Sequence, residues 1–134
     1  MINSITNDEA LQTAKLALDG LSLRQQAISN NLSNVDTPGY QAQTVDFESA
    51  LQRSLKRLDR VELSATNSAH IGLRSSGTKF DITQRSGGTE RADQNNVDID
   101  TELIDMSETG IQYQAVSQQV TKKLSLLKAI ATSR

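Results

Sequence analysis

The fold is decided by one stretch of the chain, Ser29-Asn30-Asn31-Leu32-Ser33-Asn34-Val35-Asp36-Thr37-Pro38-Gly39-Tyr40. Pro38 is the only proline. A proline lacks an N–H donor, and it disfavours helical backbone at the residue before it. Gly39 follows with the backbone freedom that a turn needs, and the asparagines and small residues before Pro38 allow a helix to pack closely. The stretch therefore predicts a helix that ends near residue 34, then a turn and an extended segment over 40–47.

Upstream of this stretch, apolar residues recur at alternating steps of three and four, which is the a/d pattern of a heptad helix. The predicted seam consists of Leu11, Ala14, Leu18, Leu21, Ile28, Leu32 and Val35. Gln25 is its one polar member. Thr6 and Glu9 have the spacing of a capping box, so the helix is expected over about residues 7–34. Gly20 inside this helix costs about 1 kcal/mol relative to alanine.

A second, shorter helix is expected after the extended segment, with Asp46 as its cap. Its apolar side carries Phe47, Leu51, Leu55 and Leu58. Its opposite side carries the basic residues Arg53, Lys56, Arg57 and Arg60. This basic stripe could meet an acidic partner or lipid headgroups, although a solvated helix face is the simpler interpretation.

Residues 61–96 differ in composition, with several glycines and few large apolar side chains. Ile71 and Leu73 alternate with polar residues, as do Phe80 and Ile82, and the turn-forming residues 75–78 lie between the two pairs. This is a weak β-hairpin pattern. We expect a polar, flexible insert that ends in a linker over 85–96.

The C-terminal part repeats the heptad pattern of the first helix. Its predicted seam consists of Ile99, Leu103, Met106, Gly110, Tyr113, Ser117, Val120, Leu124, Leu127 and Ala131. Acidic residues gather at the start of this segment and basic residues at its end, which complements a helix dipole. The sequence thus predicts a mainly α fold in which the two terminal helices pair as a coiled coil. One domain is expected from residues 1–60 plus 97–134, with 61–96 as the insert.

The composition argues against an enzyme. Only four residues of 134 are aromatic and there is no cysteine, so thiolate nucleophiles and cysteine-ligated metals are excluded. His70 is the only histidine and lacks neighbours at metal-ligand spacing. Asp98 and Asp100 are explained by their place at a helix start, and Gly87-Gly88 lacks the strand–turn–helix setting of a phosphate loop. We expect no catalytic residue, no cofactor and no metal site.

Charge and hydropathy limit the partners in the same way. The 14 basic and 16 acidic residues nearly balance, which gives no reason to expect nucleic acid. No apolar run approaches the roughly 18–20 residues of a membrane span. The first basic residue is Lys15, after Asp8 and Glu9, which does not fit a cleavable secretory signal.

The two heptad seams are thinly apolar, with Gln25, Gly110 and Ser117 at core positions. They could be ordinary core stripes. However, two such helices bury little surface against the ordering of their residues, which costs about 1–2 kcal/mol per residue. We therefore favour a chain that gains stability through assembly.

The stretch quoted first resembles the signature of bacterial flagellar axial proteins, the rod, hook and hook-associated proteins. The matching residues are Asn30, Asn31, Leu32, Asn34, Thr37, Pro38, Gly39 and Tyr40. Ser29 and Ser33 stand where that signature usually has alanine, a change of one small residue for another.

The second half of the chain is similar to the FlgB-type family of proximal rod proteins. The similar segments are Asn95-Asn96-Val97-Asp98-Ile99-Asp100-Thr101-Glu102, Ile111-Gln112-Tyr113-Gln114-Ala115 and Lys122-Lys123-Leu124-Ser125-Leu126-Leu127-Lys128. Similar residues also occur over 40–47 and 66–71. FlgC-type rod proteins share the first signature and are the nearest alternative.

The resemblance implies a non-catalytic subunit of the flagellar basal-body rod, which crosses the periplasm. It implies that the terminal helices assemble into a helical shaft, and that the chain is exported by the type III apparatus without a cleaved signal peptide. The implied neighbours are further copies of the chain, FlgC-type and FlgF-type rod proteins, and a FliE-type adaptor at the MS ring and export gate. A soluble helical adaptor or chaperone of the export system is the second hypothesis.

Overall fold

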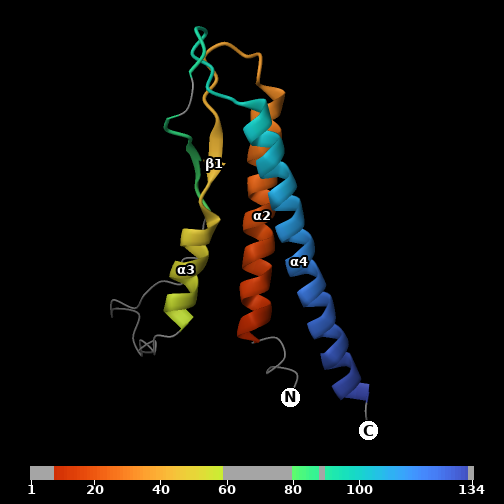
Figure 1. The fold of residues 1–134 in the computed structure, drawn as a ribbon. Helices are drawn as coiled ribbons and strands as arrows, with labels where there is room; N and C mark the ends of the chain where they lie inside the picture. Colours follow the sequence, from red (N-terminus) through yellow and green to blue (C-terminus); the bar gives the residue numbers. More distant parts are fainter. Residues whose placement is uncertain (1–7, 59–79, 88–89, 133–134) are drawn as a thin grey trace, which may run out of the picture.

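The computed structural model describes residues 8–58, 80–87 and 90–132 of the chain. Within these residues the order of elements is α2 (Glu9–Ser33), β1 (Gln43–Val45), α3 (Phe47–Leu58), β2 (Ile82–Gln84) and α4 (Ile99–Thr132) (Figure 1). The predicted mainly α fold, with long terminal helices and a small β element between them, is confirmed. His70, the strand expected at 71–73 and the basic residue Arg60 lie outside the described residues.

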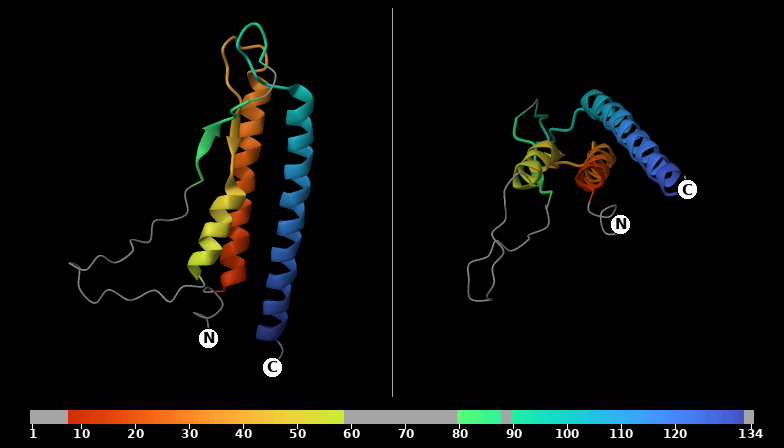
Figure 2. Two further views of the ribbon diagram at one scale, coloured as in Figure 1. Left: turned by 60° about the vertical axis from the view of Figure 1, so that its left-hand side comes forward. Right: turned by 90° about the horizontal axis from the view of Figure 1, so that it is seen from below.

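The long terminal helices α2 and α4 lie side by side and run in opposite directions (Figures 1 and 2). The sheet and α3 lie along the other side of α2, so α2 is the central element. A small apolar core joins these layers, with Leu21, Ala27, Val45 and Phe47 buried at its centre. Phe80 and Val116 pack against this core from the sheet side and from α4.

The first turn of α2 is capped by Asp8. The carboxylate oxygen Oδ1 of Asp8 accepts hydrogen bonds from the backbone N–H groups of Ala10 (3.0 Å) and Leu11 (3.4 Å). The capping box predicted at Thr6 and Glu9 is therefore corrected, because Glu9 is the first helical residue and the adjacent carboxylate already satisfies the free N–H groups. At its other end α2 stops at Ser33, with Asn34 as its C-cap, close to the predicted end.

The short helix α3 begins as predicted. The carboxylate of Asp46 accepts a hydrogen bond from the backbone N–H of Ser49 (3.1 Å), which confirms Asp46 as the cap. Phe47 then packs on α2 where Gly20 presents no side chain. A Cβ atom added at Gly20 would lie 2.7 Å from the Cβ of Phe47. The glycine that weakens α2 as an isolated helix is therefore what lets α3 approach it.

The two strands pair across a long stretch of sequence. β1 and β2 are antiparallel, with Gln43 opposite Gln84, Thr44 opposite Thr83 and Val45 opposite Ile82. The local pairing of Ile82 with a strand at 71–73 was the sequence-based expectation. In the structure Ile82 instead pairs with Val45, since the extended segment after the turn offers a strand edge beside the core.

The face that α4 turns toward α2 differs from the predicted stripe. Glu102 and Thr109 are buried, whereas Leu103, Tyr113 and Leu124 of the stripe are 49%, 40% and 51% exposed. The difference is present from the first turns of α4, where Glu102 is buried and the adjacent Leu103 is exposed, so the inward face is offset by about one residue from the predicted stripe. For contacts within the chain, the assignment of these three residues to the interface with α2 is corrected.

Candidate assembly site around the signature turn

Asn31 is the centre of a buried polar network at the end of α2. Its amide nitrogen donates hydrogen bonds to the carbonyl oxygen of Gln43 (2.8 Å) and to Glu102 Oε2 (3.0 Å). Its side-chain oxygen accepts from the backbone N–H of Gln43 (2.7 Å) and from the Tyr40 hydroxyl (3.2 Å). One side chain of the signature thus links α2, the turn, β1 and α4.

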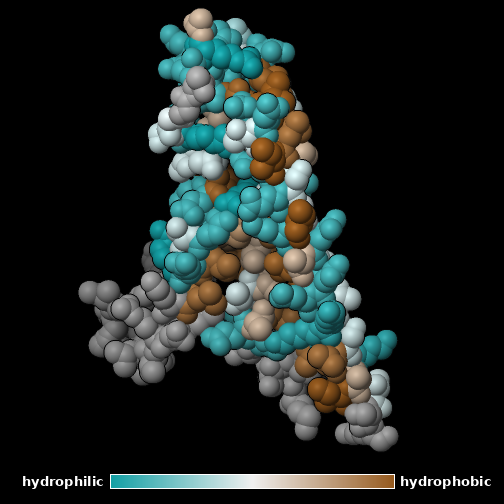
Figure 3. Space-filling view, in the orientation of Figure 1, coloured by the Kyte–Doolittle hydropathy of each residue, from teal (hydrophilic) through white to brown (hydrophobic). Residues whose placement is uncertain are grey.

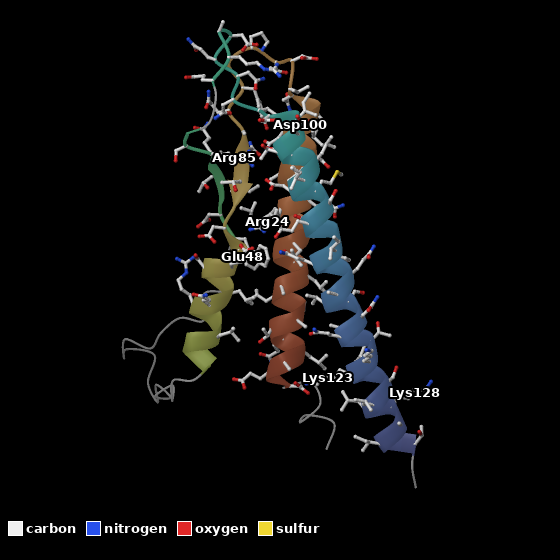
Figure 4. The ribbon with its side chains drawn as sticks, in the orientation of Figure 1. Arg24, Glu48, Arg85, Asp100, Lys123 and Lys128 are labelled. Atoms are coloured by element: carbon white, nitrogen blue, oxygen red, sulfur yellow. The ribbon has the colours of Figure 1, made fainter. Side chains whose placement is uncertain are left out.

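Glu102 enters this network from the first turns of α4. Its other oxygen, Oε1, lies 2.8 Å from a guanidinium nitrogen of Arg85, in an ion pair without hydrogen-bond geometry. Arg85 also reaches Asp105 on the next turn of α4 (3.2 Å). Figure 4 shows Arg85 extending from the end of β2 toward the start of α4. Burial and, second, the charge of Glu102 raise the pKa of the Tyr40 hydroxyl.

A second buried asparagine, Asn95, holds the turn itself. Its amide nitrogen lies within hydrogen-bond distance of three carbonyl oxygens, those of Asn34 (3.0 Å), Val35 (3.0 Å) and Thr37 (2.9 Å). Its side-chain oxygen accepts from the backbone N–H of Val97 (2.8 Å). The carbonyls of Asn34 and Thr37 also accept backbone N–H groups within the turn, from Thr37 and Tyr40, so Asn95 adds a second donor from the segment that leads into α4.

Backbone contacts complete this clamp. Gly39 adopts a φ of 72°, in the left-handed region, and its N–H donates to the carbonyl of Asp93 (2.8 Å). The side-chain oxygen of Asn96 accepts from the N–H of Ala42 (2.6 Å). The stretch expected as a linker therefore packs, over its last residues, directly onto the signature turn, because its asparagines form hydrogen bonds with the backbone of the turn and of the segment after it.

The other signature residues surround this network. Asn34 is half-buried and its amide donates to the carbonyl of Asn30 (2.8 Å), while its side-chain oxygen accepts from the Thr37 hydroxyl (3.2 Å). Asn30, Thr37, Pro38 and Gly39 are exposed, and Leu32 and Tyr40 are half-buried. The signature therefore combines one buried anchor with a surface turn.

The predicted seam residues fall into three groups by exposure. Leu21 and Ile28 of α2 are buried. The partly buried members are Leu11, Ala14, Leu18, Leu32, Val35, Met106, Val120 and Leu127. The exposed members are Leu103, Tyr113 and Leu124. The structure thus brings the α2 seam to the core and leaves much of the α4 seam outside.

The outer side of α4 also carries apolar residues. Ile104, Ile111 and Leu126 are 65%, 69% and 65% exposed. An open groove between the first two is lined by Leu103, Ile104, Ser107, Glu108, Ile111 and Gln112. Hydrophobic surface is visible along α4 in Figure 3. Exposed apolar surface of this kind marks an interaction face in soluble proteins.

A further cluster around Arg24 holds the layers together. Arg24 of α2 donates to the carbonyl of Val45 (3.0 Å), forms an ion pair with Glu48, and lies 4.5 Å from the centre of the Phe47 ring (Figure 4). A cavity of about 210 Å³ beside it is lined mainly by polar and charged groups, Arg24, Arg85, Asp105 and Glu108 among them. These contacts fix α3 and the sheet on α2.

The two carboxylates that could have formed a catalytic pair, Asp98 and Asp100, lie at the start of α4. Asp98 caps α4, since its carboxylate accepts from the N–H groups of Asp100 (3.0 Å) and Thr101 (3.4 Å). Asp100 is exposed. Among residues 8–58, 80–87 and 90–132, no three acidic or histidine side chains gather as metal ligands. None of the helices in the described part has the length and apolar character to span a membrane.

Three residues of the network were not singled out as site residues by sequence reasoning: Glu102, Arg85 and Asn95. The charge at Glu102 was assigned to the helix dipole, because a glutamate near a helix start is usually solvated. The available signal was the similarity of residues 95–102 to rod proteins, which marked the segment without giving its contacts.

The comparisons with known proteins match the segments that form α2 and the signature turn to flagellar rod proteins. The family described as flagella basal body rod protein matches residues 11–41, which cover most of α2 and the signature turn. FlgB of Escherichia coli is 30% identical over 131 residues, covering 91% of this chain and 95% of the relative. FlgB of Salmonella typhimurium is 34% identical over 112 residues (80% and 81%), and FlgB of Bacillus subtilis 29% over 122 residues (91% and 92%).

The rod-protein family match covers most of α2 and the signature turn, and the match to FlgB of Escherichia coli covers 91% of the chain, which places it in the class of structural rod proteins. The chain belongs to the FlgB family of flagellar basal-body rod proteins. The resemblance inferred from the sequence is thereby confirmed, and the chain is a rod structural protein of the flagellar basal body.

Proposed function

We propose that this chain is a subunit of the proximal rod, and that its terminal helices pack against neighbouring subunits in the helical axial shaft. The outer side of α4 carries the proposal. Ile104, Ile111 and Leu126 are each about two-thirds exposed in the single chain. Burial of apolar surface contributes roughly 25 cal/mol per Å², so assembly would recover stabilisation that the isolated chain lacks.

The proposal includes the partners and the route to them. The neighbours would be further copies of the chain, FlgC-type and FlgF-type rod proteins, and a FliE-type adaptor at the MS ring and export gate. The chain would reach the periplasmic rod through the type III export apparatus. Similarity to FlgB proteins over some nine-tenths of the chain supports this assignment.

Two seam substitutions separate assembly from folding. Leu124 is 51% exposed, so Leu124→Asp should lower the free energy of unfolding by only about 1–2 kcal/mol. In a shaft its carboxylate would be buried without a partner, at a cost of several kcal/mol, and rods should not form. Leu21 is 1% exposed, so Leu21→Asp should destabilise the chain itself.

The measurements are urea unfolding of the purified chains, and motility with basal-body counts in the source bacterium at matched protein levels. Gln119→Asp, at an exposed polar position of the same helix, is the control and should leave rods normal. Normal rods with Leu124→Asp would contradict the proposed seam. Purified basal bodies that lack the chain would instead favour a soluble adaptor or chaperone of export.

A further inference from the structure

Glu102 is the one charged side chain that is buried among the described residues, and it is 0% exposed. A buried ion pair gives little net stability, because the desolvation of the charges offsets their attraction. An apolar residue at this position would serve an ordinary helix interface at least as well. The burial of Glu102 therefore calls for an explanation other than stability.

The partners of Glu102 come from two other segments that cannot move independently. Asn31 donates to one carboxylate oxygen, and Asn31 is itself held by both backbone groups of Gln43 on β1. Arg85, which follows β2, pairs with the other oxygen and with Asp105. The carboxylate of Glu102 is thus fixed relative to α2 and to the sheet at the same time.

The side of α4 that faces α2 is not its most apolar side. Each residue of a helix is rotated by about 100° from the one before it. A rotation of α4 by one residue would bring Leu103 and Gly110 to the places of Glu102 and Thr109. Burial of apolar surface alone favours that rotated arrangement, yet Leu103 is 49% exposed in the structure.

We propose that Glu102 is a positioning residue that fixes the rotation of α4 about its own axis. Its pairing with Asn31 and Arg85 selects the arrangement in which Leu103 and the neighbouring groove with Ile104 and Ile111 stay on the outside. That this outer side meets neighbouring subunits rests on the proposed function. The rotation itself is a property of the single chain and is tested without assembly.

The chain contains no cysteine, so single cysteines report the rotation without interference. Thr109 is 2% exposed, and a side chain added at the adjacent Gly110 would meet nothing within 4 Å. In the full-length chain, the cysteine of Gly110→Cys should react with a maleimide roughly tenfold faster than that of Thr109→Cys, each rate being normalised to the same variant in urea. In a Glu102→Ala background this ratio should invert.

Asp100→Ala is the matched control, because Asp100 is an exposed acidic residue on the same turn of α4 and should leave the ratio unchanged. An unchanged ratio in Glu102→Ala would overturn the proposal. Equal, fast labelling of both cysteines with the helical circular-dichroism signal intact would also overturn it, since α4 would then have detached rather than rotated.

Should Glu102→Ala lose its helical signal, Glu102→Gln provides the deciding variant, because it removes the charge and keeps an oxygen that can accept from Asn31. A shift of its labelling ratio toward the inverted value, by a few fold, is expected. No shift in a folded Glu102→Gln chain would overturn the proposal. Rod assembly is not measured in any of these steps, so their failure and that of the proposed function remain distinguishable.

Discussion

The two ends of the helix pair are held by different kinds of contact. At the signature turn, Asn31, Asn95 and Glu102 are buried and connect α2, the sheet and α4 through hydrogen bonds and an ion pair. At the opposite end, the contact between the helices includes a partly exposed ion pair of Asp8 with Lys123 (2.7 Å; Figure 4), and the helices diverge in Figures 1 and 2.

The difference shows at which end the single chain supplies all the contacts that its buried groups need. Buried polar groups stabilise only when their partners are in place, and at the turn the chain supplies those partners. Along the last turns of α4, Leu124 and Leu126 remain exposed, so the open end leaves apolar surface unburied. Substitutions at the turn should therefore disturb the chain itself, whereas those at the open end should act mainly in the assembly.

The largest expected effect is at the turn. Replacement of Pro38 and Gly39 together by alanine removes the block to a longer helix and strains position 39, where φ is 72°. The helix should run on toward Phe47, and the carbonyls that Asn95 holds should move out of its reach. We expect a soluble protein that builds no rods, measured by motility and basal-body counts. Normal rods would show that the turn is not a geometric requirement.

The second-largest effect, a loss of stability of the single chain, is expected for Asn95→Ala. The N–H of Val97 loses its partner, and the carbonyls of Asn34, Val35 and Thr37 each lose one of two donors. One buried group left unpaired costs about 1–3 kcal/mol, and each further lost hydrogen bond costs roughly 0.5–1.5 kcal/mol, so we expect a loss of about 2–4 kcal/mol in urea unfolding. Asn30→Ala, at an exposed position, should change stability by less than about 0.5 kcal/mol. Equal effects at the two asparagines would refute the clamp.

An intermediate effect is expected where α3 meets α2. In Gly20→Ala the new Cβ would lie 2.7 Å from Phe47, and such overpacking costs about 1–3 kcal/mol, which outweighs the roughly 1 kcal/mol gained in helix propensity. Gly110→Ala offers a matched comparison, since the space there is open and the same gain should stabilise the chain. Thermal unfolding of both variants checks the opposite signs. Stabilisation by Gly20→Ala would mean that α3 is not packed at this point.

The smallest effect is expected at the open end. The hydrogen bond from Lys123 lowers the pKa of the Asp8 carboxyl below its ordinary value. The stability that this contact contributes is therefore present above the unfolded-state pKa and is lost as pH falls through the folded-state pKa. NMR titration of Asp8 should show its pKa rising in Lys123→Ala and in high salt, which screens exposed pairs. If the pKa of Asp8 did not change in Lys123→Ala, the contact between Asp8 and Lys123 would not be formed in solution.

Local features of the fold followed from the sequence. Pro38 ended the first helix near the predicted residue, because proline acts on its own neighbours in the chain. Asp46 and Asp98 cap their helices as expected, since capping needs only the next few residues. The signature of residues 30–40 identified the family for the same reason, as it is a contiguous string of residue types.

Tertiary structure alone decided which surfaces meet. The pairing of β1 with β2, the place of Asn95 under the turn and the rotation of α4 all join residues far apart in the chain. A heptad pattern gives the spacing of apolar residues but not which of two neighbouring faces turns inward. At Glu102 a buried charge with partners on two other segments selects the less apolar face, and no local pattern in α4 contains those partners.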